Sequence, residues 1–263
     1  MQDASRYIRQ CVDRAARMRT GGQAISLLAV VMAASALTVF LSTAEDVIHR
    51  DGIVRRDPAF LQLFTHFRTT PVVDAAKVIT EFGSVLALGI VAAVGGFVLW
   101  RTGYRLGHAI APTLAFALSI LSVGMLKSVI GRHRPPVSLH LVAESDLSFP
   151  SGHATDSAAV LMTIALVVAV VTLRRPLARI GTVLMAGLLV ASIGFSRLVL
   201  GVHWPTDVVG GWALGTGIAL AVVLTALFLT RPPSVAAHGA TGSLRRLQCR
   251  LHHVLARQRP VTP

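Results

Sequence analysis

The chain has 263 residues, of which 53% are hydrophobic and 14% are charged. Soluble domains carry about 25% charged residues, so this composition excludes an ordinary soluble protein and indicates an integral membrane protein. The formal net charge of +13 is typical of nucleic-acid-binding proteins. Beside long apolar segments it instead indicates anionic lipid as the partner, and we expect no nucleic acid.

Both ends of the chain are basic tails. Residues 1–22 carry arginines with apolar residues at helical spacing between them, which predicts either an amphipathic helix on an anionic membrane face or a solvated tail. Residues 231–263 carry arginines and regularly spaced leucines, which predict a second interfacial helix. Cys11 and Cys249 lie in these tails and indicate neither a disulfide framework nor a thiolate metal site.

Residues 23–230 form the predicted membrane domain, which starts with an apolar run over 24–43. This run is long enough to cross about 30 Å of hydrocarbon. The arginines before it and the small residues after it resemble a signal peptide with its cleavage site. Because the run is longer than a usual signal core, we expect a retained membrane helix.

A short interfacial helix is predicted in the first external loop. Asp57 and Pro58 mark its start, because a capping residue followed by proline is a common beginning of a helix. The helix is expected to end near Pro71. Its apolar face consists of Phe60, Leu63, Phe64 and Phe67. We expect this face to anchor the helix at the membrane surface or to line a lipid entrance.

Five more apolar runs complete an all-α bundle of six transmembrane helices. Their predicted bounds are 73–100, 108–130, 154–172, 180–199 and 206–230. Six spans put both termini on one side of the membrane, and most of the 25 lysines and arginines lie on that side. Because positive residues are enriched in cytoplasmic segments, we expect both termini in the cytoplasm of a bacterial inner membrane.

Polar side chains gather at the outer ends of these spans. Lys127 and Arg134 are two helical turns apart, and they share a face if the third span continues until Pro135 and Pro136 stop it. A lysine that extends to the membrane surface and a loop arginine would give the same pattern without any function.

A second polar group precedes the fourth span and consists of Pro150, Ser151, Gly152 and His153. A glycine lets the backbone approach a ligand, and the N-terminus of the following helix favours a bound anion. The same group is also a common way to begin a helix. We expect Asp156, in the first turn, to serve the helix dipole.

A third polar group joins the fifth and sixth spans. It holds Arg197 and His203, and Asp207 is placed four residues later to fix the tautomer of the imidazole. Taken alone, the group also suits a loop with interfacial charges. Three cations and a helix N-terminus suit a phosphate, and two histidines can divide nucleophilic attack and proton donation. Nothing in the sequence indicates a metal site, so we expect no cofactor.

These three groups resemble the three-part signature of the type 2 phosphatidic acid phosphatase superfamily over residues 72–230. The resemblance implies a helical membrane enzyme that removes phosphate from lipid phosphates or diphosphates without a metal. It implies that His203 attacks phosphorus and forms a phosphohistidine, that Asp207 orients His203, and that His153 is the general acid. The phosphate-binding residues it implies are Lys127, Arg134, Ser151, Gly152 and Arg197. Arg132 and His133, beside the first group, have no role in the signature.

The signature implies recognition of a phosphate, which all candidate lipids share, and does not indicate which lipid carries it. An outward-facing site fits undecaprenyl diphosphate, which we expect as the substrate, with phosphatidylglycerol phosphate and phosphatidic acid as alternatives. Two other classes stay open at this point, a relative of the soluble vanadate haloperoxidases and a non-catalytic lipid transporter. The sequence indicates no oligomeric state.

Overall fold

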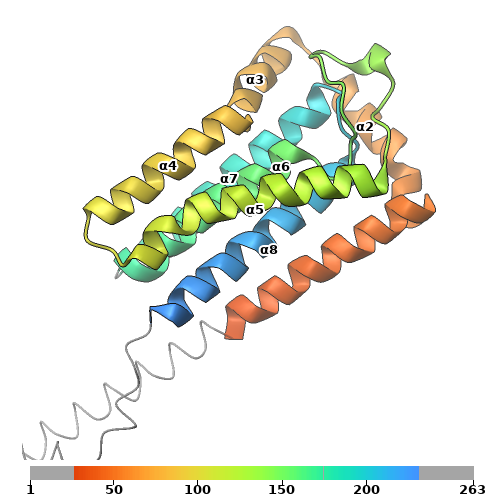
Figure 1. The fold of residues 1–263 in the computed structure, drawn as a ribbon. Helices are drawn as coiled ribbons and strands as arrows, with labels where there is room; N and C mark the ends of the chain where they lie inside the picture. The colour runs from red at the N-terminus through yellow and green to blue at the C-terminus, as the bar shows by residue number, and fades with distance from the viewer. Residues whose placement is uncertain (1–26, 174, 231–263) are drawn as a thin grey trace, which may run out of the picture. The chain divides into compact units, whose positions relative to one another are not determined.

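The structure is a computed structural model that describes residues 27–173 and 175–230. Every regular element within these ranges is helical (Figure 1). The helices predicted in the basic tails, and their contacts with anionic lipid, lie outside the described residues.

Five described helices are long and apolar enough to cross a membrane. They are Leu27–His49, α5 (Leu106–Ile130), α6 (Gly152–Val167) with its π-helical continuation η3 (Val168–Thr172), α7 (Pro176–Val199) and α8 (Pro205–Leu229). The bent pair α3 (Thr70–Glu81) and α4 (Val85–Arg101) meets the same criterion when the two helices are counted as one broken span, which gives a sixth candidate crossing. The shorter elements are η1 (Gly52–Arg56), α2 (Asp57–His66) and η2 (Val137–Leu139). The predicted all-α membrane fold is therefore confirmed.

The helix α6 lies in the middle of the bundle and packs against α4, α5, α7 and α8 (Figure 1). Small residues allow its close approach to α8. A Cβ atom on Gly215 of α8 would lie only 2.7 Å from the Cβ of Ala158, and one on Gly211 would lie 2.9 Å from the Cβ of Ala154. Such contacts between small residues are the usual basis of helix association in lipid. The hydrophobic effect does not drive this association, because lipid tails are as apolar as the side chains.

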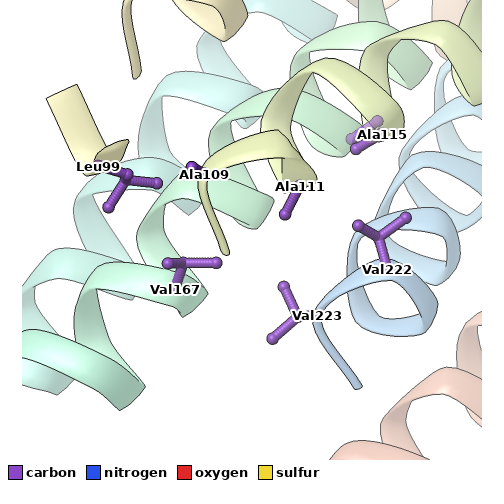
Figure 2. Packing of buried hydrophobic residues seen from close by; sticks show 8 residues of the cluster. Leu99, Ala109, Ala111, Ala115, Val167, Val222 and Val223 are labelled. Atoms are coloured by element: carbon purple, nitrogen blue, oxygen red, sulfur yellow. The ribbon is translucent and has the colours of Figure 1, made fainter. Parts of the chain in front are cut away.

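The end of the bundle far from the predicted site is an alanine and valine core. Figure 2 shows this core between α4, α5, α6 and α8, where short side chains from each helix point toward one another. Its buried members are Leu99, Ala109, Ala111, Ala115, Ala159, Val167, Val222 and Val223. Large apolar side chains such as Leu86 and Phe97 instead lie exposed on the outer faces of the spans, as expected for surfaces that contact lipid.

The second predicted span, 73–100, is broken in the structure. Its two halves, α3 and α4, meet at 51° across residues 82–84. Ser84 is the N-cap of α4 and accepts a hydrogen bond from the Ala87 N–H at 3.3 Å. A Cβ atom on Gly83 would lie 2.9 Å from Cδ2 of His153, so the break sets a bare backbone against a predicted site residue.

The third span also differs from the prediction. The helix α5 ends at Ile130, where Gly131 takes the left-handed conformation with φ of 67°. Pro135 and Pro136 therefore do not end this helix, and Arg134 lies in the following loop and not on a shared helical face with Lys127. The first span differs less and continues past its predicted end to His49.

The predicted interfacial helix is α2, which ends at His66. Phe60, Leu63 and Phe67 are exposed, whereas Phe64 stacks on Phe195 of α7 with ring centroids 5.8 Å apart. The sequence suggested that Asp57 caps α2, but this is wrong. Arg56 is the N-cap, and it makes no side-chain capping bond. The carboxylate of Asp57 instead reaches the start of α8.

Candidate active site

One cavity of about 320 Å³ collects the predicted site residues from four parts of the chain. Lys127 lies in the last turn of α5, His153 in the first turn of α6 and Arg197 in the last turn of α7. Antiparallel spans bring these helix ends to the same end of the bundle (Figure 1). The predicted residues that line the cavity are Lys127, Arg134, Gly152, His153, Arg197 and His203.

His203 is buried between α7 and α8 and has a partner on each ring nitrogen. Nδ1 lies 3.3 Å from Oδ2 of Asp207, and Nε2 lies 3.0 Å from Nη1 of Arg134. Because an arginine can only donate, Nε2 is the acceptor and Nδ1 carries the proton. Burial lowers the pKa of His203 well below its usual range, and the positive charges of Arg134 and Arg197 lower it further. The imidazole is therefore neutral, and the lone pair of Nε2 accepts from Arg134, which also lines the cavity.

Asp207 is fully buried behind His203, at the start of α8. Its Oδ2 also accepts from the backbone N–H of Trp204 at 2.8 Å, which satisfies one of the free donors at this helix N-terminus. A second carboxylate serves the same helix end, because Oδ1 of Asp57 accepts from the N–H of Thr206 at 3.1 Å. Two negative groups at a helix N-terminus are also favoured by the helix dipole.

The turn that carries His203 needs a glycine at position 201. Gly201 has φ of +73°, a left-handed conformation that side chains other than glycine's disfavour. A Cβ atom there would also collide with the backbone oxygen of Leu139 and with the guanidinium of Arg68. Arg68 donates to the carbonyl of Leu139 at 2.8 Å and to that of Val199 at 2.7 Å, which holds the turn in place.

The three cations of the cavity are tied to the surrounding helices and loops. Nη1 of Arg197 donates to Oγ1 of Thr80 in α3 at 2.8 Å, and its Nε has no hydrogen-bond partner among the described residues. Arg134 donates from Nη1 to the carbonyl of Val202 at 2.7 Å, as well as to His203. The cations thus keep fixed positions on protein groups while they face the cavity.

Two carboxylates that sequence reasoning missed form ion pairs with these cations. Asp146 pairs with both Lys127 and Arg134, and Glu144 pairs with both Arg134 and Arg197. Lys127 and Arg134 therefore meet through Asp146 and not along one helix. Burial raises the pKa of Asp146, but hydrogen bonds from Lys127 and Arg134 outweigh this and lower the pKa to about 2. The sequence signal was the pair of acidic residues in the loop between the first two signature groups.

The second signature group divides between the cavity and its wall. Gly152 lines the cavity, whereas Ser151 is fully buried and is not among the lining residues. The Ser151 N–H donates to the backbone oxygen of Asp207 at 3.0 Å, so this amide is already engaged and joins α6 to α8. Phosphate binding by this pair of amides stays a prediction, and Gly152 is the member of the pair that lines the cavity.

Asp156 differs from its predicted role. It lies beyond the first turn of α6, is 2% exposed, and lines the cavity together with Lys127. Its Oδ1 has no hydrogen-bond partner among the described residues. A surface carboxylate that interacts only with the helix dipole would be solvated, so Asp156 belongs to the wall of the cavity.

Within residues 27–173 and 175–230, no group of three or more His, Cys, Asp or Glu side chains is placed to hold a metal ion. The ionisable side chains that line the cavity are three cations, two histidines and three carboxylates. Such a set can bind a tetrahedral anion and can combine a nucleophilic imidazole with a second imidazole for proton transfer.

Known proteins are similar to this chain in sequence and in fold. The family model described as the PAP2 superfamily matches residues 108–231. Phosphatidylglycerophosphatase B of Bacillus subtilis (strain 168) is 30% identical over 194 residues, which cover 72% of this chain and 86% of that protein. Decaprenylphosphoryl-5-phosphoribose phosphatase of Mycolicibacterium smegmatis is 34% identical over 143 residues, which cover 53% of this chain and 71% of that protein.

A solved structure agrees with these sequence relatives. The crystal structure of a transmembrane PAP2-type phosphatidylglycerolphosphate phosphatase from Bacillus subtilis matches with a TM-score of 0.66 and 28% identity. The match covers 76% of this chain and 98% of that chain. The likeness therefore extends over the helical bundle and not only over the signature groups.

Proposed function

Because this chain belongs to the PAP2 superfamily of membrane lipid phosphatases, we propose that His203 carries the transferred phosphoryl group as a phosphohistidine. Lys127, Arg134 and Arg197 bind the oxygens of the terminal phosphate, together with the N–H of Gly152. His153 serves as the general acid and base. The observation that carries this proposal is the single cavity shared by both histidines and all three cations.

In the first step, the lone pair on Nε2 of His203 attacks phosphorus while the bond between phosphorus and the lipid oxygen breaks. His153 gives its proton to that oxygen, so the lipid leaves as an alcohol, or as a monophosphate if the substrate is a diphosphate. Asp207 accepts the Nδ1–H of His203 throughout and stabilises the positive charge that develops on the ring. The 3.3 Å and 3.0 Å contacts on the two ring nitrogens support this tautomer.

In the second step, water attacks the phosphohistidine. His153, now neutral and without its donated proton, takes a proton from the water as the oxygen bonds to phosphorus and the bond from nitrogen to phosphorus breaks. The products are inorganic phosphate and a neutral His203 with its original tautomer. The charge on the phosphoryl oxygens is stabilised in both steps by the same three cations, which supports a reaction without a metal.

The substrate we propose to test first is phosphatidylglycerol phosphate. This choice rests on the Bacillus subtilis relatives, which match most of their own length and are named for that activity. Undecaprenyl diphosphate, the substrate expected from the sequence, stays a prediction. We further propose that the cavity opens on the extracytoplasmic side, and the excess of Lys and Arg on the side of both termini supports that orientation.

Phosphate release by the purified protein in detergent tests both the chemistry and the substrate. Three lipids are compared at equal mole fraction, namely phosphatidylglycerol phosphate, undecaprenyl diphosphate and phosphatidic acid. We expect turnover that is unchanged by EDTA and that falls by about 10⁴-fold or more in His203→Ala. Radiolabelled phosphate from the substrate should remain on the wild-type protein after an alkaline quench and should be absent from His203→Ala.

Two results would contradict this proposal. Full activity of His203→Ala would remove the nucleophile, and loss of wild-type activity in EDTA would require a metal. Exposed His49 provides a matched control, because His49→Ala removes an imidazole from the end of the first span without touching the cavity.

A further inference from the structure

We infer that Arg132 is a positioning residue of the reaction, which holds Asp207 charged and oriented so that Asp207 can hold His203. This inference rests on the roles proposed for His203 and Asp207. Arg132 is outside the signature and does not line the catalytic cavity. Its guanidinium donates to Thr206, Asp207 and Asp57, and not to the catalytic imidazoles. Its effect would therefore pass entirely through Asp207.

The guanidinium of Arg132 lies between two buried carboxylates. Nη1 donates to Oδ1 of Asp207 at 2.5 Å, and Nη2 donates to Oδ2 of Asp57 at 2.5 Å. The side chains of Asp207 and Asp57 are 0% and 2% exposed, and that of Arg132 is 12% exposed. Nη1 also contacts Oγ1 of Thr206 at 2.7 Å, and this hydroxyl donates to Oδ2 of Asp57 at 2.5 Å. The four side chains form one connected network at the start of α8.

The charges of this network require the arginine. Two carboxylates close together and out of water cannot both stay ionised without a nearby cation. Burial raises the pKa of Asp57, and only the hydrogen bonds from Thr206 and Arg132 and the positive charge of Arg132 oppose that rise. Without the charge of Arg132, the protonated form of these buried carboxylates would be favoured. A protonated Asp207 is a poorer acceptor for the Nδ1–H of His203, and the imidazole would lose its fixed tautomer.

The arginine also fixes the direction of the Asp207 carboxylate, because the two oxygens have different partners. Oδ1 binds Arg132, with Ser148 Oγ at a longer 3.5 Å, whereas Oδ2 faces His203 and the N–H of Trp204. Without the short contact on Oδ1, the carboxylate keeps one short hydrogen bond, from the N–H of Trp204, and its orientation is less well fixed. Oδ2 lies 3.3 Å from Nδ1 of His203 and 2.8 Å from the backbone nitrogen of Trp204. The longer contact, to His203, would be lost first.

Local backbone geometry puts Arg132 in this position. Gly131 ends α5 with φ of 67° and turns the chain toward α8. Trp204 contacts the residues on this turn. Its indole N–H donates to the carbonyl of His133 at 3.0 Å, and its ring centroid lies 5.8 Å from the guanidinium of Arg132. A lysine would supply the charge but not two donors at a fixed spacing, so it could not serve both carboxylates equally.

A double-mutant cycle in the full-length protein tests this inference. Phosphate release from phosphatidylglycerol phosphate in detergent micelles is measured for wild type, Arg132→Gln, Asp207→Asn and the double variant, with melting temperature measured alongside. We expect Arg132→Gln to lower kcat by about 100-fold and to change KM by less than about threefold, as for other groups that act through a catalytic partner. In the Asp207→Asn background the same substitution should lower kcat by less than about threefold, because its target is already lost.

Two further variants keep the test decisive. Arg132→Lys should fold and should recover part of the rate, about tenfold above Arg132→Gln, and it replaces Arg132→Gln in the cycle if the latter does not fold. Exposed Arg55 is the matched control, and Arg55→Gln should keep the wild-type kcat.

The inference is overturned if Arg132→Gln keeps kcat within twofold of wild type. It is also overturned if the loss is the same in both backgrounds, which would make Arg132 a purely structural residue. A different result, wild-type kcat in Asp207→Asn, would remove the role of Asp207 and so contradict the proposed function itself.

Discussion

The two ends of the helical bundle are built from opposite kinds of contact. At the end that holds the candidate active site (the catalytic end), buried charged groups such as Arg197 and Asp207 are held by hydrogen bonds and ion pairs. At the other end, alanine and valine side chains such as Ala111 and Val167 are buried without any polar partner (Figure 2). Buried charges cost free energy, whereas small apolar residues that pack closely stabilise helices in lipid. Close packing at the apolar end therefore stabilises the bundle, whereas the buried charges at the catalytic end cost stability.

The largest effect on this contrast is expected from Asp207→Asn, at the catalytic end. An asparagine keeps the size of the side chain and can still accept from Trp204, so the fold should remain. It no longer offers a charged acceptor to Nδ1 of His203, and we expect kcat to fall by about 10³- to 10⁴-fold, as in hydrolases that lose an orienting aspartate. Phosphate release and the melting temperature check the two halves of this expectation. A normal rate would reduce Asp207 to a residue that only begins a helix.

Val167→Ala, in the apolar core, is expected to lower stability and to leave kcat nearly unchanged. Val167 is fully buried, and the deletion of its methyl groups leaves a cavity that should cost about 2 kcal/mol of stability. We expect the melting temperature to fall by roughly 4–8 °C while kcat changes by less than about twofold. Leu184→Ala on α7, where the side chain is 67% exposed, removes more atoms and should cost less. A large loss of kcat in Val167→Ala would mean that the two ends are not independent.

The smallest effect is expected from Asp146→Asn, which sharpens the contrast within the catalytic end. Asp146 is 54% exposed and occupies Lys127 and Arg134, the cations that we propose bind phosphate. Its neutralisation should cost little stability and should free both cations for the ligand. We expect inorganic phosphate to inhibit the variant at about fivefold lower concentration, because an exposed ion pair is worth about 1 kcal/mol.

The neighbouring substitution Ser145→Ala should leave the inhibition constant unchanged, since Ser145 is exposed and outside the cavity. Weaker inhibition of Asp146→Asn by phosphate would show that Asp146 organises the cations and does not compete for them.

Much of this architecture follows from the sequence, because it depends on local signals. Apolar runs long enough to span a bilayer predict the crossings, and Asp57 with Pro58 predicts the start of α2. The alternation of the spans then brings Lys127, His153 and His203 to the same end of the bundle. Each of these predictions needs only the length and polarity of a segment.

The features that sequence reasoning missed depend on contacts between distant segments. Sequence reasoning placed one span over 73–100, although its first half carries Asp74, Lys77 and Glu81, and the close approach of Gly83 to His153 is seen only in the structure. The end of α5 at Gly131 was assigned to prolines further along, because a left-handed glycine gives a weaker signal than a proline. Glu144 belongs to a loop whose path no periodic pattern describes. These features became visible only with the helices in place.

The carboxylate of Asp57 has a consequence for the way the protein is assembled. Its carboxylate oxygens accept from Thr206, which is synthesised 149 residues later, so the segment around α2 cannot make these contacts until the start of α8 is in place. A nascent chain that stops before α8 already holds both histidines and every cation of the cavity, yet it lacks Asp207 and the helix end to which the loop is tied. Insertion of the last helix thus completes the candidate active site, and the proposed chemistry requires a chain that extends into α8.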